Sequence, residues 1–204
     1  MASETASYYF IGNLLCLDFV NTEIVSRGER VDLLKGLSGF TEWLRAAGRL
    51  SPAEARAAEQ RWSTTSEGKA AFLEAISLRG QLRVMAERLT SGKTAGQGAI
   101  DAINRVLASR ASYPQVVRKG DGYATVVQSA TESPRHLLVP IAESAAWLLE
   151  HGDLSYLRRC ENPICILYFY DTTKNKRRRW CSMEACGSRA KAAAYYRRLR
   201  AVKR

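Results

Sequence analysis

Four of the five cysteines lie in the last quarter of the chain, arranged as two short pairs. Cys160 and Cys165 form one C-x4-C motif, a gap of 15 residues follows, and Cys181 and Cys186 form a second. Two short pairs separated by a hairpin-length gap are typical of a structural zinc site, in which four thiolates close a tetrahedron. We therefore predict one structural Zn²⁺ held by these four cysteines. Two disulfides, or four unrelated buried thiols, are the alternatives.

The N-terminal residues bear on the choice between zinc and disulfides. Disulfides persist only in an oxidising compartment. The opening stretch MASETASYYFIGNLLCLDFVN has no basic n-region, and Asn13 and Asp18 interrupt its apolar run, which is unlike an export signal. No apolar run has the length needed to cross a bilayer. We expect a cytoplasmic protein, associated with the nucleoid, in which Cys16 is a buried core thiol.

The positive charge is concentrated around the second cysteine pair. The chain carries a net charge of +11, and residues 174–204 hold 12 Lys/Arg against one acid, Glu184. Residues 1–173 hold 19 basic and 19 acidic side chains and are therefore neutral. Charge clustered in this way indicates a surface that binds a polyanion, and DNA is the expected partner. The alternative is a solvated basic tail.

The basic residues of this region are candidates for contacting nucleic acid. From Arg189 onward we predict a helix whose packing stripe is Ala192, Tyr195, Leu199 and Val202, at helical spacing. Guanidinium groups on the other side pair well with phosphates or guanine edges. The candidate contacts are Arg177, Arg178 and Arg179 before the second cysteine pair, and Arg189, Lys191, Tyr196, Arg197 and Arg200 on the helix.

The predicted fold class is α+β, a mostly helical N-terminal domain (residues 1–152) followed by a small zinc module (residues 153–204). Within the module we expect the treble-clef plan of knuckle, hairpin, second knuckle and helix. The hairpin would pair a strand at 166–171 with a return strand at 177–180. Metal binding would supply much of the folding energy of so short a segment.

Capping and periodicity predict the elements of the N-terminal domain. Ser51, Pro52 and Glu54 form a capping box at the start of one helix. A strand and turn are expected before a short helix within 8–23. Further helices are expected at 38–48, 67–89, 96–110 and 133–152, the last kinked at Pro140, and a Val-rich hairpin at 115–128.

The stretch CENPIC, followed by FYDTTKNKRRRWCSMEACGSRAK, strongly resembles the CGNR zinc finger. The upstream LDFVNT (residues 17–22), the WLRAAG helix and the Val-rich hairpin resemble the ABATE domain that usually precedes that finger. The resemblance implies a bacterial, stress-induced transcription regulator, with the four cysteines on zinc and the finger on DNA. The tetrad here is Cys186-Gly187-Ser188-Arg189, with serine in place of asparagine. Ser188 is expected to cap the helix instead.

The N-terminal domain has the position of a sensor. Asp18, Asn21 and Thr22 interrupt an apolar segment, so they either line a pocket for a small effector or form a cap and turn that fix the fold. A homodimer is also expected, because one finger offers only a short DNA footprint.

Other functional classes find less support in the sequence. A treble-clef nuclease needs a histidine base in the module, and both histidines, His136 and His151, lie upstream of it. A closed four-thiolate site also leaves no open coordination position for catalysis. We therefore expect no enzyme. The alternative to a DNA regulator is a module that binds RNA or an acidic protein, without duplex sequence preference.

Overall fold

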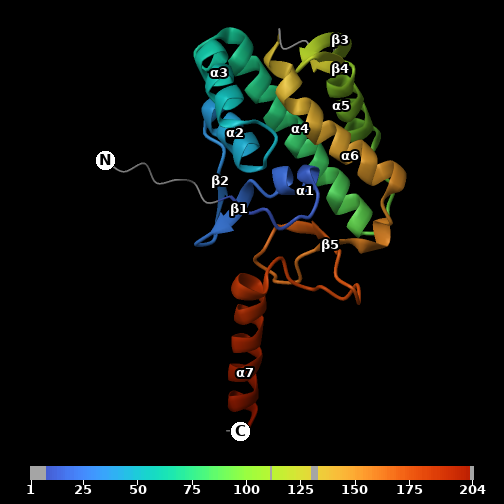
Figure 1. Ribbon diagram of the computed structural model, residues 1–204. Helices are drawn as coiled ribbons and strands as arrows, with labels where there is room; N and C mark the ends of the chain where they lie inside the picture. The colour runs from blue at the N-terminus through green and yellow to red at the C-terminus, as the bar shows by residue number, and fades with distance from the viewer. Residues whose placement is uncertain (1–7, 111, 130–132, 203–204) are drawn as a thin grey trace.

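The computed structural model describes residues 8–110, 112–129 and 133–202. Six helices form the main body, and the seventh extends away from it below the zinc module (Figure 1). The helices are α1 (Leu15–Val20), α2 (Gly36–Ala46), α3 (Pro52–Trp62), α4 (Ser66–Thr90), α5 (Gln97–Leu107), α6 (Val139–His151) and α7 (Ser188–Val202). The strands form three separate antiparallel hairpins, which confirms the predicted α+β class. They are β1 (Glu23–Ser26) with β2 (Glu29–Asp32), β3 (Ser112–Lys119) with β4 (Gly122–Ser129), and β5 (Leu157–Arg159) with β6 (Tyr168–Tyr170).

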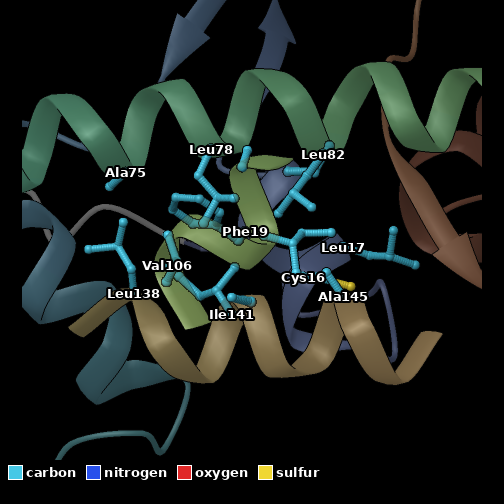
Figure 2. Packing of buried hydrophobic residues seen from close by; sticks show 14 of the residues in the cluster. Cys16, Leu17, Phe19, Ala75, Leu78, Leu82, Val106, Leu138, Ile141 and Ala145 are labelled. Atoms are coloured by element: carbon cyan, nitrogen blue, oxygen red, sulfur yellow. The ribbon is translucent and has the colours of Figure 1, made fainter. Parts of the chain in front are cut away.

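The core of the body lies between the long helix α4 and helix α6. Figure 2 shows the side chains of α1 filling the space between these two helices. Cys16 and Phe19 of α1 are fully buried there, beside Leu78 of α4 and Ile141 of α6. Burial raises the pKa of Cys16 to about 11, so this thiol stays protonated. The core therefore positions α1, whose polar residues reach the zinc module.

The predicted capping box at the start of α3 is confirmed. The Glu54 N–H donates to Ser51 Oγ at 3.2 Å, and the Ser51 N–H donates to the Glu54 carboxylate at 2.7 Å. Helix α2 ends at Ala46, and Gly48 follows shortly after it with a φ of 68°. Glycine adopts this left-handed conformation without strain. The helices predicted at 38–48, 67–89 and 96–110 are present as α2, α4 and α5, within one to three residues at each end.

Two other predictions for the body need correction. No single kinked helix covers 133–152, because the segment begins as the 3-10 helix η1 (Pro134–Leu138) and continues as α6. Pro140 therefore occupies the first turn of α6, where a missing N–H costs nothing. No strand precedes α1 among residues 8–14, and the first strand, β1, follows it. The Val-rich hairpin is confirmed as β3 and β4, in which Lys119 lies opposite Gly122.

The predicted return strand at 177–180 is wrong. The partner of β6 is β5, which precedes the first knuckle instead of following the loop. The other edge of β6 is already occupied, because the Tyr170 N–H donates to Gly12 O at 2.8 Å and Asn21 bonds the backbone of Tyr168. Asp171 then closes the loop that follows by accepting from the Arg178 N–H at 2.8 Å. No edge of β6 remains for a return strand.

Candidate metal centre and nucleic-acid interface

The four predicted ligands meet at one point. The sulfur atoms of Cys160, Cys165, Cys181 and Cys186 all lie within 4.8 Å of one another, and Cys165 and Cys181 are 3.8 Å apart. Zinc–sulfur bonds of about 2.3 Å in a tetrahedron place sulfur atoms about 3.8 Å apart. All four cysteines are buried. The donor set, spacing and burial therefore fit one structural zinc ion.

Local hydrogen bonds shape the two knuckles, which are the turns at residues 160–165 and 181–186 that carry the cysteine pairs. In the first, the Cys160 N–H donates to Leu167 O at 3.0 Å and the Cys165 N–H donates to Asn162 O at 2.9 Å. The second is the π-helical turn η3 (Met183–Gly187), which runs directly into α7. Because Cys186 belongs to this turn, the metal site fixes the position at which α7 begins.

Hydrogen bonds to sulfur prepare the site for a dication. Asn162 Nδ2 donates to Cys186 Sγ at 3.3 Å, and the Cys181 N–H donates to Cys160 Sγ at 3.4 Å. Hydrogen bonds from the thiols of Cys165 and Cys181 lower the pKa of Cys160, while the same contacts raise the pKa values of those two donors. N–H groups aimed at sulfur stabilise thiolates, the form that binds metal. In the sequence, the position of Asn162 between two of the cysteine ligands is the one signal for this role.

Apolar side chains shield the cysteine cluster from solvent. The four cysteines form one buried cluster with Leu167 and Phe169, and the side chains that pack against this cluster are Ile11, Ile24, Ile166 and Trp180. Two of these residues, Ile11 and Ile24, come from the N-terminal part of the chain. The zinc module therefore completes its shell with residues from the helical body.

Arg178 is half-buried, and its side chain is engaged within the protein. Its guanidinium group donates to the carbonyl oxygens of Trp180 and Ile11, each at 3.0 Å, and to that of Cys181. It also stacks on the ring of Phe169, 4.1 Å from the centroid. Burial lowers the pKa of Arg178, and its contacts join the zinc module to the N-terminal segment.

The other two arginines of this run face solvent. Arg177 is exposed. Arg179 is also exposed, pairs with Glu161 at 2.6 Å and lies over the ring of Trp180. Its backbone oxygen accepts from the Glu161 N–H at 3.0 Å, which links the two knuckles. Both guanidinium groups can reach an external anion, although Arg179 would first have to leave Glu161.

Helix α7 carries the remaining candidates. Arg189, Lys191, Tyr196 and Arg197 are all exposed on a helix that extends away from the body (Figure 1). The predicted packing stripe is wrong at its described positions, because Ala192 is exposed and Tyr195 is 60% exposed. The side chains of Leu199, Arg200 and Val202 lie outside the described part of the structure.

Ser188 does not cap α7. Its hydroxyl donates to Met183 O at 2.9 Å, inside a continuous helical run that begins with η3. The capping role falls to Ser182, whose Oγ accepts from the Ala185 N–H at 3.0 Å. The helix thus starts one turn earlier than the sequence suggested, and Ser188 supports that turn from within.

Asp18, Asn21 and Thr22 are buried and hold segments of the chain together. Asp18 accepts from the Gly12 N–H at 2.7 Å, and Thr22 accepts from Arg79 at 2.8 Å. Asn21 bonds the backbone of Tyr168 in the zinc module. These contacts favour the second of the two alternatives, in which the three residues fix the fold. Asp18 also borders an open hollow lined by residues that include Leu14 and Arg49.

The fold and the cysteine cluster together define a zinc-finger protein built on a helical domain. The chain belongs to the ABATE family, described as "Putative stress-induced transcription regulator", whose model matches residues 13–152. The model of the CGNR zinc finger matches residues 156–199, so the predicted resemblance is confirmed. The search of curated proteins finds no match. Neither family description names an enzyme, and no described helix is both long and apolar enough to cross a membrane.

Proposed function

We propose that this protein is a zinc-dependent, DNA-binding regulator of transcription, with α7 as the helix that enters DNA. The observation that carries the proposal is the exposure of Arg189, Lys191 and Arg197 on a helix that leaves the body. A helix of 15 residues is about 22 Å long, and the major groove admits a helix of this width. Basic side chains along it would neutralise phosphates on either side of the groove.

Zinc would act by orienting α7. Cys186 lies in η3, and α7 follows without a break. A tetrahedral site that fixes Cys186 therefore fixes the direction in which the helix leaves the module. Arg177 and Arg179 would add phosphate contacts from the loop before the second knuckle.

The helical domain, with the boundary at residues 152 and 153, would sense a small effector and pass its state to the finger. Contacts already join the two parts, since Asn21 bonds Tyr168 and Arg83 donates to Ile166 O at 3.0 Å. A homodimer would supply a second finger and so lengthen the DNA footprint. The protein would then act in the cytoplasm, at the nucleoid.

One observation favours a second candidate function. Tyr195 and Tyr196 are 60% and 62% exposed on α7, beside its basic residues. Exposed aromatic rings among cations suit stacking on unpaired bases, so an RNA-binding module is the alternative. An acidic protein would bind the same cations, but it would offer no unpaired bases for the two tyrosine rings to stack on.

The test is selection from random duplex DNA by the zinc-loaded protein, with a chelator-treated sample in parallel. We expect an enriched motif that disappears on chelation, and two symmetric half-sites if the protein is a dimer. Arg197→Gln should weaken binding and lower the salt slope by about one, whereas Arg105→Gln on α5 should change neither. Tighter binding to single-stranded RNA than to any selected duplex would favour the alternative.

A further inference from the structure

We infer that the helical domain binds a small aromatic carboxylic acid in a pocket between α3 and the η1–α6 segment. The pocket has a volume of about 440 Å³, and its lining comes from the end of α2 through α3 and from η1 and α6. Ligand sites in proteins commonly measure about 300–1,000 Å³. The inference deepens the proposed effector role and rests on it only for its regulatory meaning.

The base of the pocket is apolar and aromatic. Leu44, Ala58, Leu137 and Val139 are buried and line it together with Trp62. The Trp62 ring meets His136 edge to face, with 5.5 Å between centroids. A flat apolar ligand would add a further partner to this pair, since aromatic rings attract one another in stacked and edge-on arrangements.

The charged groups of the lining favour an anion. Three guanidinium groups border the pocket, from Arg49, Arg61 and Arg110, against two carboxylates. Glu143 pairs with Arg110 at 3.0 Å, and Glu54 accepts from the Ser51 N–H at 2.7 Å in the capping box. Both acids are engaged within the protein, and the three guanidinium groups of the lining exceed the two carboxylates by one positive charge.

Arg49 is the residue best placed to hold a carboxylate. It follows the C-terminal turn of α2 at the rim and is exposed. Among the residues that the structure describes, its guanidinium group has no hydrogen-bond or ion-pair partner. Arg61 lies over the Trp62 ring, 4.9 Å from its centroid, so a second cation stands beside the aromatic base. A guanidinium group binds a carboxylate through two parallel hydrogen bonds.

The probe is 1-naphthaleneacetate, with the uncharged 1-naphthaleneacetamide as its matched partner, titrated into the zinc-loaded full chain by calorimetry. We expect the acid to bind about fivefold more tightly than the amide, the upper contribution of one partly screened ion pair. Arg49→Gln should bring the two dissociation constants together. Arg56→Gln, an exposed α3 residue outside this pocket, should leave their ratio unchanged.

A second pair of measurements places the ligand. Ala57→Phe fills the pocket and should abolish binding of both compounds, with unfolding curves to confirm that the variant folds. In the wild-type protein, the indole N–H resonance of Trp62 should shift on titration, while that of Trp147, which is not in the lining, should not. The resonance shift keeps the test valid if Ala57→Phe fails to fold.

The inference would be overturned by any of four results. These are equal affinity for acid and amide, an unchanged ratio in Arg49→Gln, undiminished binding in a folded Ala57→Phe, or no binding of the acid at millimolar concentration. DNA affinity is measured separately, with and without the acid. Loss of the DNA-binding proposal would therefore leave a positive ligand result standing, and the reverse holds as well.

Discussion

Asn21 bonds the backbone of Tyr168 with both ends of its side-chain amide. Its Nδ2 donates to Tyr168 O at 2.8 Å, and the Tyr168 N–H donates to its Oδ1 at 2.9 Å. An asparagine in this position occupies the edge of β6 as a neighbouring strand would. The helical domain and the zinc module are thus joined through a residue with no exposed surface.

We expect Asn21→Ala to lower the free energy of unfolding by about 3 kcal/mol. The substitution leaves the N–H and C=O of Tyr168 buried without partners, and each such group costs about 1–3 kcal/mol. Urea denaturation measures the loss, and hydrogen exchange at the Tyr168 amide should accelerate. Asn104→Ala, at an exposed site on α5, serves as the control and should stay within about 0.5 kcal/mol of wild type. Equal effects in the two variants would show that the paired amide adds nothing.

Cys181→Ser should remove the bound zinc. Three thiolates remain, and a serine hydroxyl is a poor replacement for the fourth. We expect metal analysis after dialysis against a chelator to find about one zinc per wild-type chain and almost none in the variant. Hydrogen exchange should rise across residues 160–187 more than in α4. Cys16→Ser is the matched control, because that buried thiol lies outside the cluster and its loss should leave the zinc content unchanged. Full retention of zinc by Cys181→Ser would refute the four-cysteine site.

Neighbouring arginines should behave in opposite ways. Arg178→Gln removes the donors to the carbonyl oxygens of Ile11, Trp180 and Cys181, so we expect a loss of about 2–3 kcal/mol in unfolding free energy. Arg177→Gln should leave stability unchanged, because that side chain is exposed, and should instead weaken DNA binding in a salt-dependent way. Thermal unfolding and titration with DNA measure the two effects. The assignment fails if Arg177→Gln proves the more destabilising substitution.

The carboxyl group of Asp18 predicts a dependence of stability on pH. Burial raises its pKa from 3.8 to about 6, so between these values the folded protein holds a proton that the unfolded chain releases. Stability therefore falls as the pH rises through this window. From pH 5 to pH 7 the wild-type protein should lose about 1 kcal/mol relative to Asp18→Asn, whose amide does not titrate. Parallel stability profiles for the two proteins over this range would contradict the assignment.

Local signals in the sequence were sufficient for several features. The capping box at Ser51 and Glu54 needs only residues three apart, and its geometry is as predicted. The four cysteines were identified because zinc ligands of the same type recur at short, regular spacing. In both cases the partners lie close together along the chain or are fixed by one metal.

Features that depend on distant partners were missed. Nothing in residues 177–180 (RRRW) indicates that the side chain of Arg178 turns inward, because one of its acceptors, the carbonyl oxygen of Ile11, lies 167 positions away in the sequence. The predicted return strand at 177–180 was wrong for the same reason, because the distant residues Gly12 and Asn21 occupy the edge of β6. The stripe on α7 has helical spacing, but periodicity cannot show whether a neighbouring surface exists. For α7, no described segment covers Tyr195.

The joint between Asn21 and Tyr168 also constrains how the protein is made. Translation delivers α1 early and β6 much later, because the two partners are 147 positions apart in the sequence. While the ribosome is still adding the intervening helices, Asn21 has no strand edge to pair with, and Ile11 and Ile24 have no cysteine cluster to cover. Contacts so far apart along a chain form slowly. Final assembly of the joint between the helical domain and the zinc module must therefore wait until the finger has emerged from the ribosome.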